Sequence, residues 1–310
     1  MCTQLNAEAF ANEPIIPIPD DVITQPEQVE LGRILFNDVR LSVGDPVSCA
    51  SCHSMSMGGA DGQVVSTGVK SEKGSINSPT VLNSSLQFRQ FWNGRAETLL
   101  EQIDGPIANP KEMGSSWDEV LKKLKEDVFY VAKFNLLYPD GLTIPNIKQA
   151  IITFEESLLT PNSRFDQYLR GNHKAITEDE LKGYSLFKEY GCVSCHQGVA
   201  VGGNLFQKFG AFGDFFVDRG YVTEADFGRF SVTKKEQDRF VFKVPTLRNI
   251  ELTAPYLHDG SIASLENAVI VMMKYQLGRK PKEQNVQLIV QFLKTLTGQY
   301  QGKNLKGKAP

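Results

Sequence analysis

Two runs of the form Cys-x-x-Cys-His, at positions 49–53 and 192–196, constrain this 310-residue chain more than any other feature. In such a run two thiols can add across the two vinyl groups of a haem, while the adjacent imidazole binds the iron. A pair of redox Cys-x-x-Cys motifs or one Cys₄ zinc site are alternatives, but the histidine after the second cysteine in both copies disfavours them. We therefore predict two covalent haem c groups, one on Cys49, Cys52 and His53, the other on Cys192, Cys195 and His196.

Length and composition allow two domains of ordinary size, since 41% of the residues are hydrophobic. Lys and Arg are scattered and the net charge is −3, so nothing favours nucleic-acid binding. The longest apolar runs, such as 267–273, are too short to span a bilayer. Haem c is attached outside the cytoplasm and the start has no apolar leader core, so we expect a periplasmic protein whose leader was removed or replaced. Cys2 could be a lipid-anchored N-terminus, an introduced remnant or a free thiol.

The segments around the two motifs repeat. Gly-x-x-Leu-Phe begins at Gly32 before the first motif and at Gly183 before the second, and each lies on a helical pattern. Capping boxes are predicted at Thr24 with Glu27 and at Thr177 with Glu180. A Pro-Thr-x-x-Asn turn follows at 79–83 and again at 245–249, an offset of 166 that also pairs Trp92 with His258, Gly94 with Gly260 and Leu99 with Leu265.

We predict a mainly α fold of two cytochrome c-like domains related by internal duplication, each with one haem c. The N-terminal domain would span 1–162 and be completed by the tail 299–310, and the C-terminal domain would span 163–298. A helix is expected over 147–159, and the proline-rich segment 13–19 should form an extended strap. Strand-like alternation is scarce.

The open side of each haem differs between the copies. In the second copy Met272 and Met273 follow His258, and a thioether is a good sixth ligand that raises the haem potential. Methionines are more often core gap-fillers, but beside a haem with a missing ligand we favour Met272 as the ligand. The same offset places Pro106 in the first copy, and proline offers no ligand. The first haem can therefore bind a small molecule.

Two polar residues lie near Pro106 in the sequence. The carboxylate of Glu112 could take a proton from one peroxide oxygen and return it to the other, although a solvated loop acid is the commoner role. Gln102 could hydrogen-bond a bound oxygen species, or be an ordinary residue of the helix surface.

These features resemble the bacterial dihaem cytochrome c peroxidases, within the superfamily of dihaem peroxidases and MauG-like proteins. The resemblance runs from about Gln25 to about Gly298. It is carried by both haem motifs with their flanks and by the strings 57–61 (MGGAD), 77–83 (NSPTVLN), 91–96 (FWNGRA), 105–113 (GPIANPKEM) and 256–260 (YLHDG).

The resemblance implies a role for each matching residue. The N-terminal haem would be the low-potential peroxidatic site, with Glu112 as acid and base, Gln102 as its pocket partner and Pro106 near the iron. The C-terminal haem would be the high-potential electron-accepting site, and Trp92 would conduct electrons between the two.

The resemblance also implies a calcium ion at the domain interface. Its ligands would be the side chain of Asn77, the carbonyls of Thr253 and Pro255, and waters. His258 is expected at the cofactor site of the second haem.

One position departs from the family. Members usually carry a histidine after Ser-x-Gly in the loop that follows the Gly58-Gly59 pair, and it caps the peroxidatic iron until the other haem is reduced. Here Val69 follows Ser66-Thr67-Gly68. We expect the first haem to be five-coordinate or water-bound in the oxidised enzyme. An amine from Lys70 or Lys73 is a less favoured alternative, since it must first lose its charge.

The expected activity is reduction of hydrogen peroxide to water, with electrons from a small cytochrome c or a cupredoxin, in a homodimer. A MauG-like dihaem oxidase acting on a partner protein is the nearest alternative. That group carries a tyrosine in place of Met272, and Tyr275 lies nearby. A dihaem electron-transfer cytochrome is the third reading, and Pro106 and Glu112 disfavour it.

Overall fold

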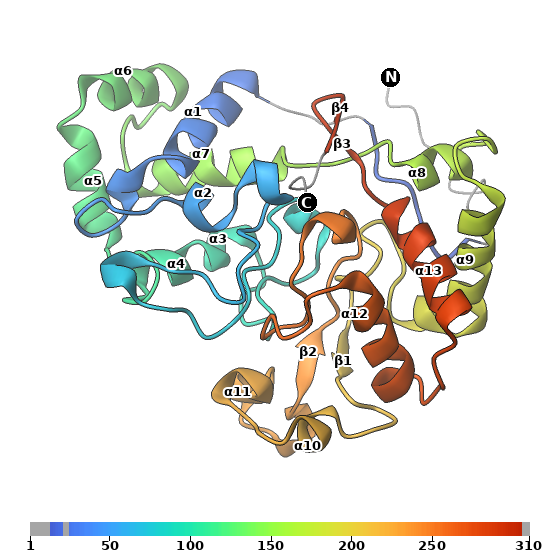
Figure 1. Cartoon of the computed structure of the whole chain (residues 1–310). Helices are drawn as coiled ribbons and strands as arrows, with labels where there is room; N and C mark the ends of the chain where they lie inside the picture. Colours follow the sequence, from blue (N-terminus) through green and yellow to red (C-terminus); the bar gives the residue numbers. More distant parts are fainter. Residues whose placement is uncertain (1–12, 21–24, 306–310) are drawn as a thin grey trace.

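The computed structural model describes residues 13–20 and 25–305, and it confirms the expectation of a mainly helical chain (Figure 1). The strands are short and antiparallel, β1 with β2 and β3 with β4. The helices are α1 (Pro26–Phe36), α2 (Cys49–Cys52), α3 (Leu99–Gln102), α4 (Asp104–Ala108), α5 (Trp117–Lys125), α6 (Val128–Leu137), α7 (Ile144–Glu156), α8 (Arg164–Leu169), α9 (Glu178–Glu189), α10 (Phe215–Arg219), α11 (Phe230–Thr233), α12 (Leu265–Val271) and α13 (Glu283–Lys294), and the strands are β1 (Phe206–Lys208), β2 (Val241–Lys243), β3 (Gln299–Tyr300) and β4 (Lys303–Asn304).

Helix starts follow local capping chemistry. The predicted box at α9 is confirmed, because the Thr177 hydroxyl accepts from the Glu180 amide and the Glu180 carboxylate accepts from the Thr177 amide. Thr24 lies outside the described residues, and α1 begins at Pro26 after Gln25. The helix expected over 147–159 is α7, which begins and ends three residues earlier because Thr143 caps it and a proline is tolerated in its first turn.

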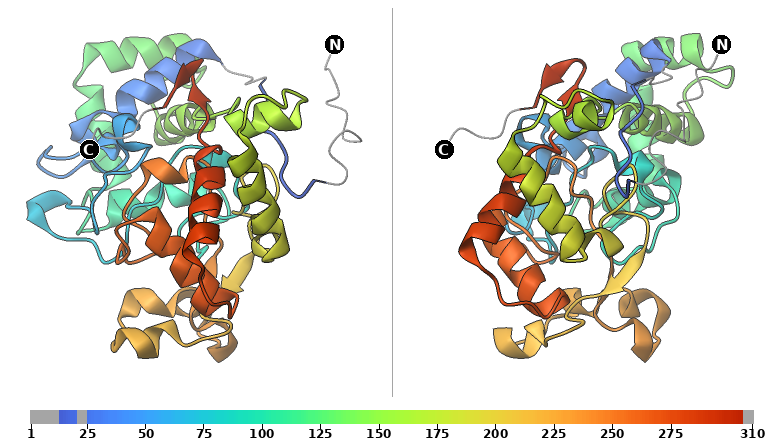
Figure 2. Two further views of the ribbon diagram at one scale, coloured as in Figure 1. Left: turned by 45° about the vertical axis from the view of Figure 1, so that its right-hand side comes forward. Right: turned by 90° about the vertical axis from the view of Figure 1, so that its right-hand side faces the viewer.

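The two most extensive helix–helix contacts are α1 with α7 and α9 with α13, and a glycine allows the close approach in each. A Cβ on Gly32 of α1 would lie 1.9 Å from the Ala150 carbonyl oxygen of α7. A Cβ on Gly183 of α9 would lie 2.0 Å from the Leu288 carbonyl oxygen of α13. The second pair runs side by side in Figure 2. The two Gly-x-x-Leu-Phe runs therefore place backbone against backbone.

Each helix pair contributes to one apolar core. The first core lies between α1, α5, α6 and α7, and Tyr300 and Leu305 from the C-terminal end pack on it. The second lies between α8, α9, α12 and α13. The extended strap at 13–19 contacts the second core, where Ile15 is fully buried and the Pro14 carbonyl accepts from the Gly198 amide. The strap is thus held by a part of the chain that follows it by some 180 residues.

Positions 166 residues apart share unusual backbone conformations. Asn83 and Asn249 both have left-handed φ, 60° and 61°, and both are fully buried. Their side-chain amides donate to one acceptor, the Thr160 hydroxyl, at 2.7 and 2.9 Å. Phe91 and Leu257 form a second left-handed pair, at 66° and 69°. The two Pro-Thr-x-x-Asn turns therefore meet at one buried hydrogen-bonded centre.

The segment 206–242 lies between the second haem motif and the second turn. It contains β1, α10 and α11 and leads into β2, at the bottom of Figure 1. Its aromatic side chains form a third cluster with Val271 and Tyr275, and Trp92 and Met272 pack against it. This segment, through residues such as Phe209 and Phe242, lines the cavity at the second Cys-x-x-Cys-His run.

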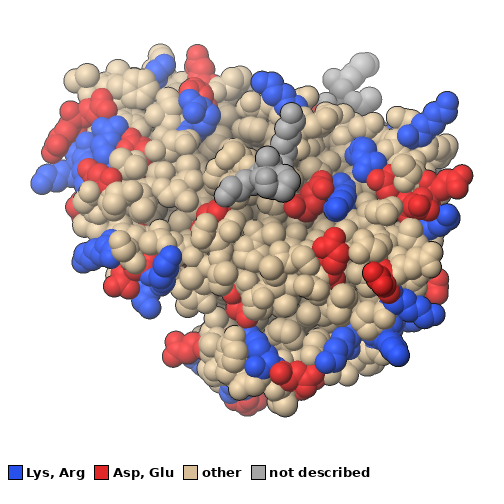
Figure 3. Space-filling view, viewed as in Figure 1, with Lys and Arg blue, Asp and Glu red and all other residues tan. Residues whose placement is uncertain are grey.

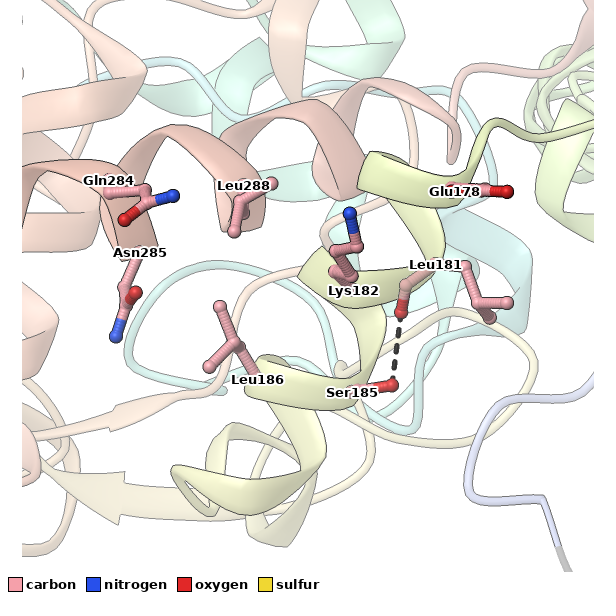
Figure 4. A pocket seen from close by; sticks show the side chains of 8 residues that line it. All are labelled: Glu178, Leu181, Lys182, Ser185, Leu186, Gln284, Asn285 and Leu288. Atoms are coloured by element: carbon pink, nitrogen blue, oxygen red, sulfur yellow. Dashed lines mark hydrogen bonds between the residues drawn. The ribbon is translucent and has the colours of Figure 1, made fainter.

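On the face shown in Figure 3, Lys and Arg are interspersed with Asp and Glu, and no extended patch of positive charge is seen there. Among the described residues, no helix has both the length and the apolar character needed to cross a bilayer. A shallow surface hollow between α9 and α13 is lined by residues such as Leu181, Lys182 and Leu288 (Figure 4). Its lining contains no cysteine or histidine.

Candidate functional site

A cavity of about 250 Å³ gathers the residues predicted around the second haem. It lies between α9, α12, α13 and the loops of the first half, and its lining is predominantly apolar. Haem sites require such an apolar slot with few polar groups. The predicted residues in its lining are Cys192, Cys195, His196, Met272, His258, Trp92, Asn77, Thr253 and Pro255.

The imidazole of His196 is suited to bind iron. Burial lowers its pKa to about 4, so the ring is neutral, as a metal ligand must be. A 3₁₀ turn over Cys192–Ser194 places the motif at the end of α9, and the His196 amide donates to the Cys192 carbonyl. None of the four motif cysteines forms a disulfide in the described chain, so all are available for thioether bonds.

Met272 and Tyr275, the two candidates for the sixth ligand of the second haem, lie in different surroundings. Met272 begins a single π-helical turn, Met272–Gln276, that continues α12, and it lines the cavity. Such turns are frequent at functional sites, because they re-aim side chains. The Tyr275 hydroxyl donates to Asp218 at 2.8 Å, and the residue is not part of the lining. Met273 also lines the cavity, but it is buried in the second core, whereas Met272 packs against the third cluster.

A buried lysine in the cavity wall has no carboxylate partner within the described part of the chain. Lys243 of β2 is 7% exposed, and burial lowers its pKa to about 8. Its ammonium donates to the Gln87 side chain from the first half of the chain. A buried charge of this kind calls for an anion. The carboxylate of a haem propionate would supply one, so the cavity fits the group that the cysteines would attach.

His258 is held by an acidic residue that sequence reasoning missed. Its Nε2 lies 2.7 Å from the buried Asp226 carboxylate, which is also paired with Arg219. Contacts with Arg219, Thr223 and His258 outweigh burial and lower the pKa of Asp226 to about 2. The capping pattern Thr223-x-x-Asp226 is visible in the sequence, but nothing there ties it to His258.

Trp92 lies between the two halves. Its ring meets the His258 ring edge-on with centroids 6.3 Å apart. Its indole Nε1–H donates to the Asn77 carbonyl at 2.9 Å, and the next residue, Ser78, donates to the Cys52 carbonyl at 3.4 Å. Trp92 therefore contacts the second cavity directly and the first haem motif through one short backbone link.

The first motif forms the short helix α2, so that Cys49 and Cys52 lie one turn apart on one side. The His53 Nδ1 lies 3.2 Å from the Gly59 carbonyl oxygen, and donation there leaves Nε2 free for iron. Burial lowers the His53 pKa, which keeps the ring neutral. The ring lies beside Phe36 of α1, so the motif packs on the first core.

Glu112 lies close enough to the first motif for its charge to act on the Cys52 thiol. Burial raises the pKa of Glu112. The Asn109 amide donates to the carboxylate at 2.7 Å and lowers the pKa, but the effect of burial is larger. The Met113 amide donates to the Pro106 carbonyl, which ties this loop to α4. Gln102 is half-buried at the end of the preceding helix α3. Burial thus holds the pKa of the Glu112 carboxyl group above its ordinary value.

The loop around Val69 folds onto the same segment. Val69 is buried, and its amide donates to the Glu112 carbonyl at 2.9 Å. Gly68 fits there because a Cβ would lie 2.2 Å from the Lys111 carbonyl oxygen. Lys70 and Lys73 are exposed, and Lys73 donates to the Thr67 hydroxyl. His173 is also exposed, on the connection before α9.

The residues named for calcium come together at the edge of the second cavity. Asn77 is buried, its amide group donates to the Gln63 carbonyl, and its backbone N–H donates to the His258 carbonyl. The Asn77 Oδ1 accepts no hydrogen bond from the described residues. Carbonyl and amide oxygens are the donors that calcium prefers, so these residues fit such an ion.

Comparison with known proteins gives a consistent result. A family model described as "Di-haem cytochrome c peroxidase" matches residues 26–174. The cytochrome c551 peroxidase of Nitrosomonas europaea is 51% identical over 290 residues, or 93% of this chain and 85% of that protein. The cytochrome c peroxidase Ccp of Escherichia coli is 46% identical over 295 residues, and the match spans 95% of this chain but 63% of that protein. A solved MauG-like protein associated with microbial copper homeostasis aligns with a TM-score of 0.79 at 28% identity, covering 91% of this chain and 93% of that one.

Proposed function

Because the chain belongs to the di-haem cytochrome c peroxidase family, we propose that it reduces hydrogen peroxide to water at an N-terminal haem on Cys49, Cys52 and His53. Electrons would arrive through a C-terminal haem on Cys192, Cys195, His196 and Met272, from a small cytochrome c or a cupredoxin. The corresponding backbone conformations of the two halves support an origin by internal duplication. A periplasmic location and a homodimer are part of the same proposal.

The observation that carries the proposal is the half-buried Glu112 carboxyl group beside the first motif. When bound, the first haem supplies an iron position for peroxide and the redox equivalents. Glu112 would accept the proton of the near peroxide oxygen and return it to the far oxygen, which leaves as water. Its raised pKa suits both steps, and the Asn109 amide orients the carboxylate. Pro106 would leave the iron position open, and Gln102 would hydrogen-bond the bound oxygen.

Trp92 is proposed as the electron conduit. Its indole contacts the second cavity, and its Nε1–H bond to Asn77 leads through Ser78 to Cys52. An aromatic ring in this position shortens each electron-transfer step. A calcium ion on Asn77, Thr253 and Pro255 would hold the same junction in place.

The second site favours a peroxidase over a MauG-like oxidase. Met272 lines the cavity, whereas the Tyr275 hydroxyl is engaged by Asp218. A thioether ligand raises the haem potential and suits electron uptake. A pure electron carrier would have no use for Glu112 or for Pro106 in the position of a ligand.

The test is peroxide-dependent oxidation of a reduced monohaem cytochrome c by the haem-loaded protein. Two cytochromes should be oxidised per peroxide, since H₂O₂, two electrons and two protons give two waters. Oxidation without this stoichiometry would contradict the proposal, and absence of any turnover would favour an electron carrier.

We also propose that the first haem needs no reductive activation, because Val69 replaces the capping histidine and the lysines of its loop are exposed. The oxidised protein should give a high-spin ferric EPR signal and turn over at once. Val69→His should convert this signal to low spin and impose a requirement for half-reduction, while Val69→Leu should not. Two low-spin signals from an inert wild-type enzyme would contradict the idea.

A further inference from the structure

One buried acid in the first half has an apolar counterpart in the second. The close contact of Gly32 involves Ala150 and Phe154 of α7, and that of Gly183 involves Leu288 and Phe292 of α13. The two helices are thereby aligned residue by residue. The residue after Phe154 is Glu155, whereas the residue after Phe292 is Leu293.

The buried surroundings of these two positions suit leucine but not glutamate. Leu293 is 3% exposed in the second core, as expected for leucine. Glu155 is 7% exposed, and its Oε2 has no hydrogen-bond partner among the described residues. A buried carboxyl group without a partner destabilises the fold relative to leucine. The second half demonstrates that the packing itself accepts leucine, so a packing role does not explain the acid.

The position of Glu155 points to the first haem. Its charge acts on the Cys49 thiol, whose sulfur would form one thioether bond. Its neighbour Phe154 packs edge-on against Phe36, and Phe36 lies beside the His53 ring. The acid therefore lies in the wall of the first haem site, behind the attachment segment.

Among residues 13–20 and 25–305, no cation is paired with this carboxylate. The only other titratable group that perturbs Glu155 is Glu156 on the same helix, which is exposed and repels a negative charge. The facing attachment segment contributes Cys49, and α1 contributes apolar residues at its contact with α7. Burial raises the pKa of Glu155 to about 8. In the haem-loaded protein, a positive charge on the iron would stabilise the ionised form.

We propose that Glu155 is a redox-linked proton acceptor of the N-terminal haem, binding one proton when this haem takes up one electron. This rests on the assignment of that haem to Cys49, Cys52 and His53, but not on peroxide turnover. The iron goes from ferric to ferrous with an electron from the donor protein or a mediator. The carboxylate becomes a carboxylic acid with a proton from solvent, so the net charge of the site stays constant and no bond to carbon changes.

The test is a spectroelectrochemical titration of each haem in the haem-loaded protein from pH 5.5 to 9. The potential of the first haem should fall with a slope approaching about 59 mV per pH unit, the value for a tenfold change with one electron. Glu155→Gln should lower this slope markedly, with any remainder due to Glu112, and leave that of the second haem unchanged. Met272→Leu should shift only the potential of the second haem, which identifies the redox transition that belongs to each haem.

The controls separate the possible failures. Glu156→Gln removes the exposed neighbouring acid and should keep the slope. Glu155→Leu introduces the residue found at the aligned position 293, and it replaces the glutamine variant in the titration if that variant does not fold. Redox-induced infrared difference spectra should contain a carboxylic acid band on reduction that Glu155→Gln lacks. An unchanged slope in both Glu155 variants, or no slope in the wild type, overturns the proposal. Absence of peroxide turnover with an intact slope counts against the proposed function alone.

Discussion

At the scale of single residues, Glu112 is a carboxyl group whose environment matches its proposed task. Burial favours its neutral form and raises its pKa, while the Asn109 amide stabilises the ionised form. The net result is a pKa above the ordinary value of glutamate, which favours both uptake and release of a proton. The same residue fully exposed would remain ionised and would be a poor acid.

We predict that Glu112→Gln lowers kcat for peroxide reduction about 10²- to 10⁴-fold, the range for loss of a general acid and base. Only the ionised carboxylate can accept the first proton. The wild-type rate should therefore fall as the pH drops through the raised pKa, above the ordinary range of glutamate. A pH profile of kcat/KM checks both points. Asn109→Asp is the companion variant, and its added negative charge should move the acidic limb to higher pH. A glutamine variant with wild-type activity would exclude the assigned role.

Met272 and Met273 allow a matched comparison of ligand and core residue. Met272→Leu should remove the thioether ligand, lower the potential of the second haem and abolish the sulfur-to-iron absorption band near the red edge of the spectrum. Met273→Leu should leave the potential unchanged and cost less than about 1.5 kcal/mol of stability, because the swap conserves volume in the core. A potential that moves only in the Met273 variant would reverse the assignment.

At the scale of elements, glycine determines how closely two helices approach. In both helix pairs a Cβ at the crossing would lie about 2 Å from a carbonyl oxygen of the partner helix. Backbone cannot yield as a flexible side chain can. The helices of each pair would have to separate, and the haem motif that follows α1 or α9 would move with them.

We predict that Gly32→Ala and Gly183→Ala each lower the free energy of unfolding by about 1–3 kcal/mol, as overpacking does in a dense core. Gly74→Ala is the control, because its Cβ would meet nothing closer than 3.6 Å and its φ is not left-handed. Thermal unfolding of the haem-loaded variants measures the effect. Equal melting temperatures for all three would contradict the backbone-contact argument.

At the scale of the whole molecule, Thr160 joins the two halves. Its hydroxyl is the common acceptor of the Asn83 and Asn249 amides, and its own amide donates to Asn83. All three residues are fully buried. The link couples the two Pro-Thr-x-x-Asn turns, each of which leads to one haem site.

We predict that Thr160→Val, which preserves shape, leaves two buried donors unsatisfied and lowers the free energy of unfolding by about 2–4 kcal/mol. Thr160→Ser keeps the hydroxyl and should cost about 1 kcal/mol for the lost methyl group. Denaturant unfolding followed separately by haem absorbance and by tryptophan fluorescence measures the loss and its cooperativity. A valine variant as stable as the serine variant would exclude this centre as a stabilising link.

The chemistry carried by short motifs could be predicted from the sequence, because it depends on spacing along the chain. Both haem attachment runs, the cap of α9 and the repeat of the two turns belong to this class. The mainly helical fold follows from the same local patterns. The roles of Trp92 and the calcium residues came from resemblance, which also favoured the acid–base role of Glu112 over that of a solvated loop acid.

Tertiary structure decided what depends on contacts between distant segments. The strap at 13–19 packs on the second core because its apolar side chains are buried there and its carbonyls find donors in that half. Asp226, Lys243 and Glu155 are ordinary charged residues in the sequence. Their significance arises from burial, since a charge removed from water must find a partner or change its protonation state. Neither the burial nor the partner can be predicted from the neighbouring residues in the sequence, because both depend on distant segments.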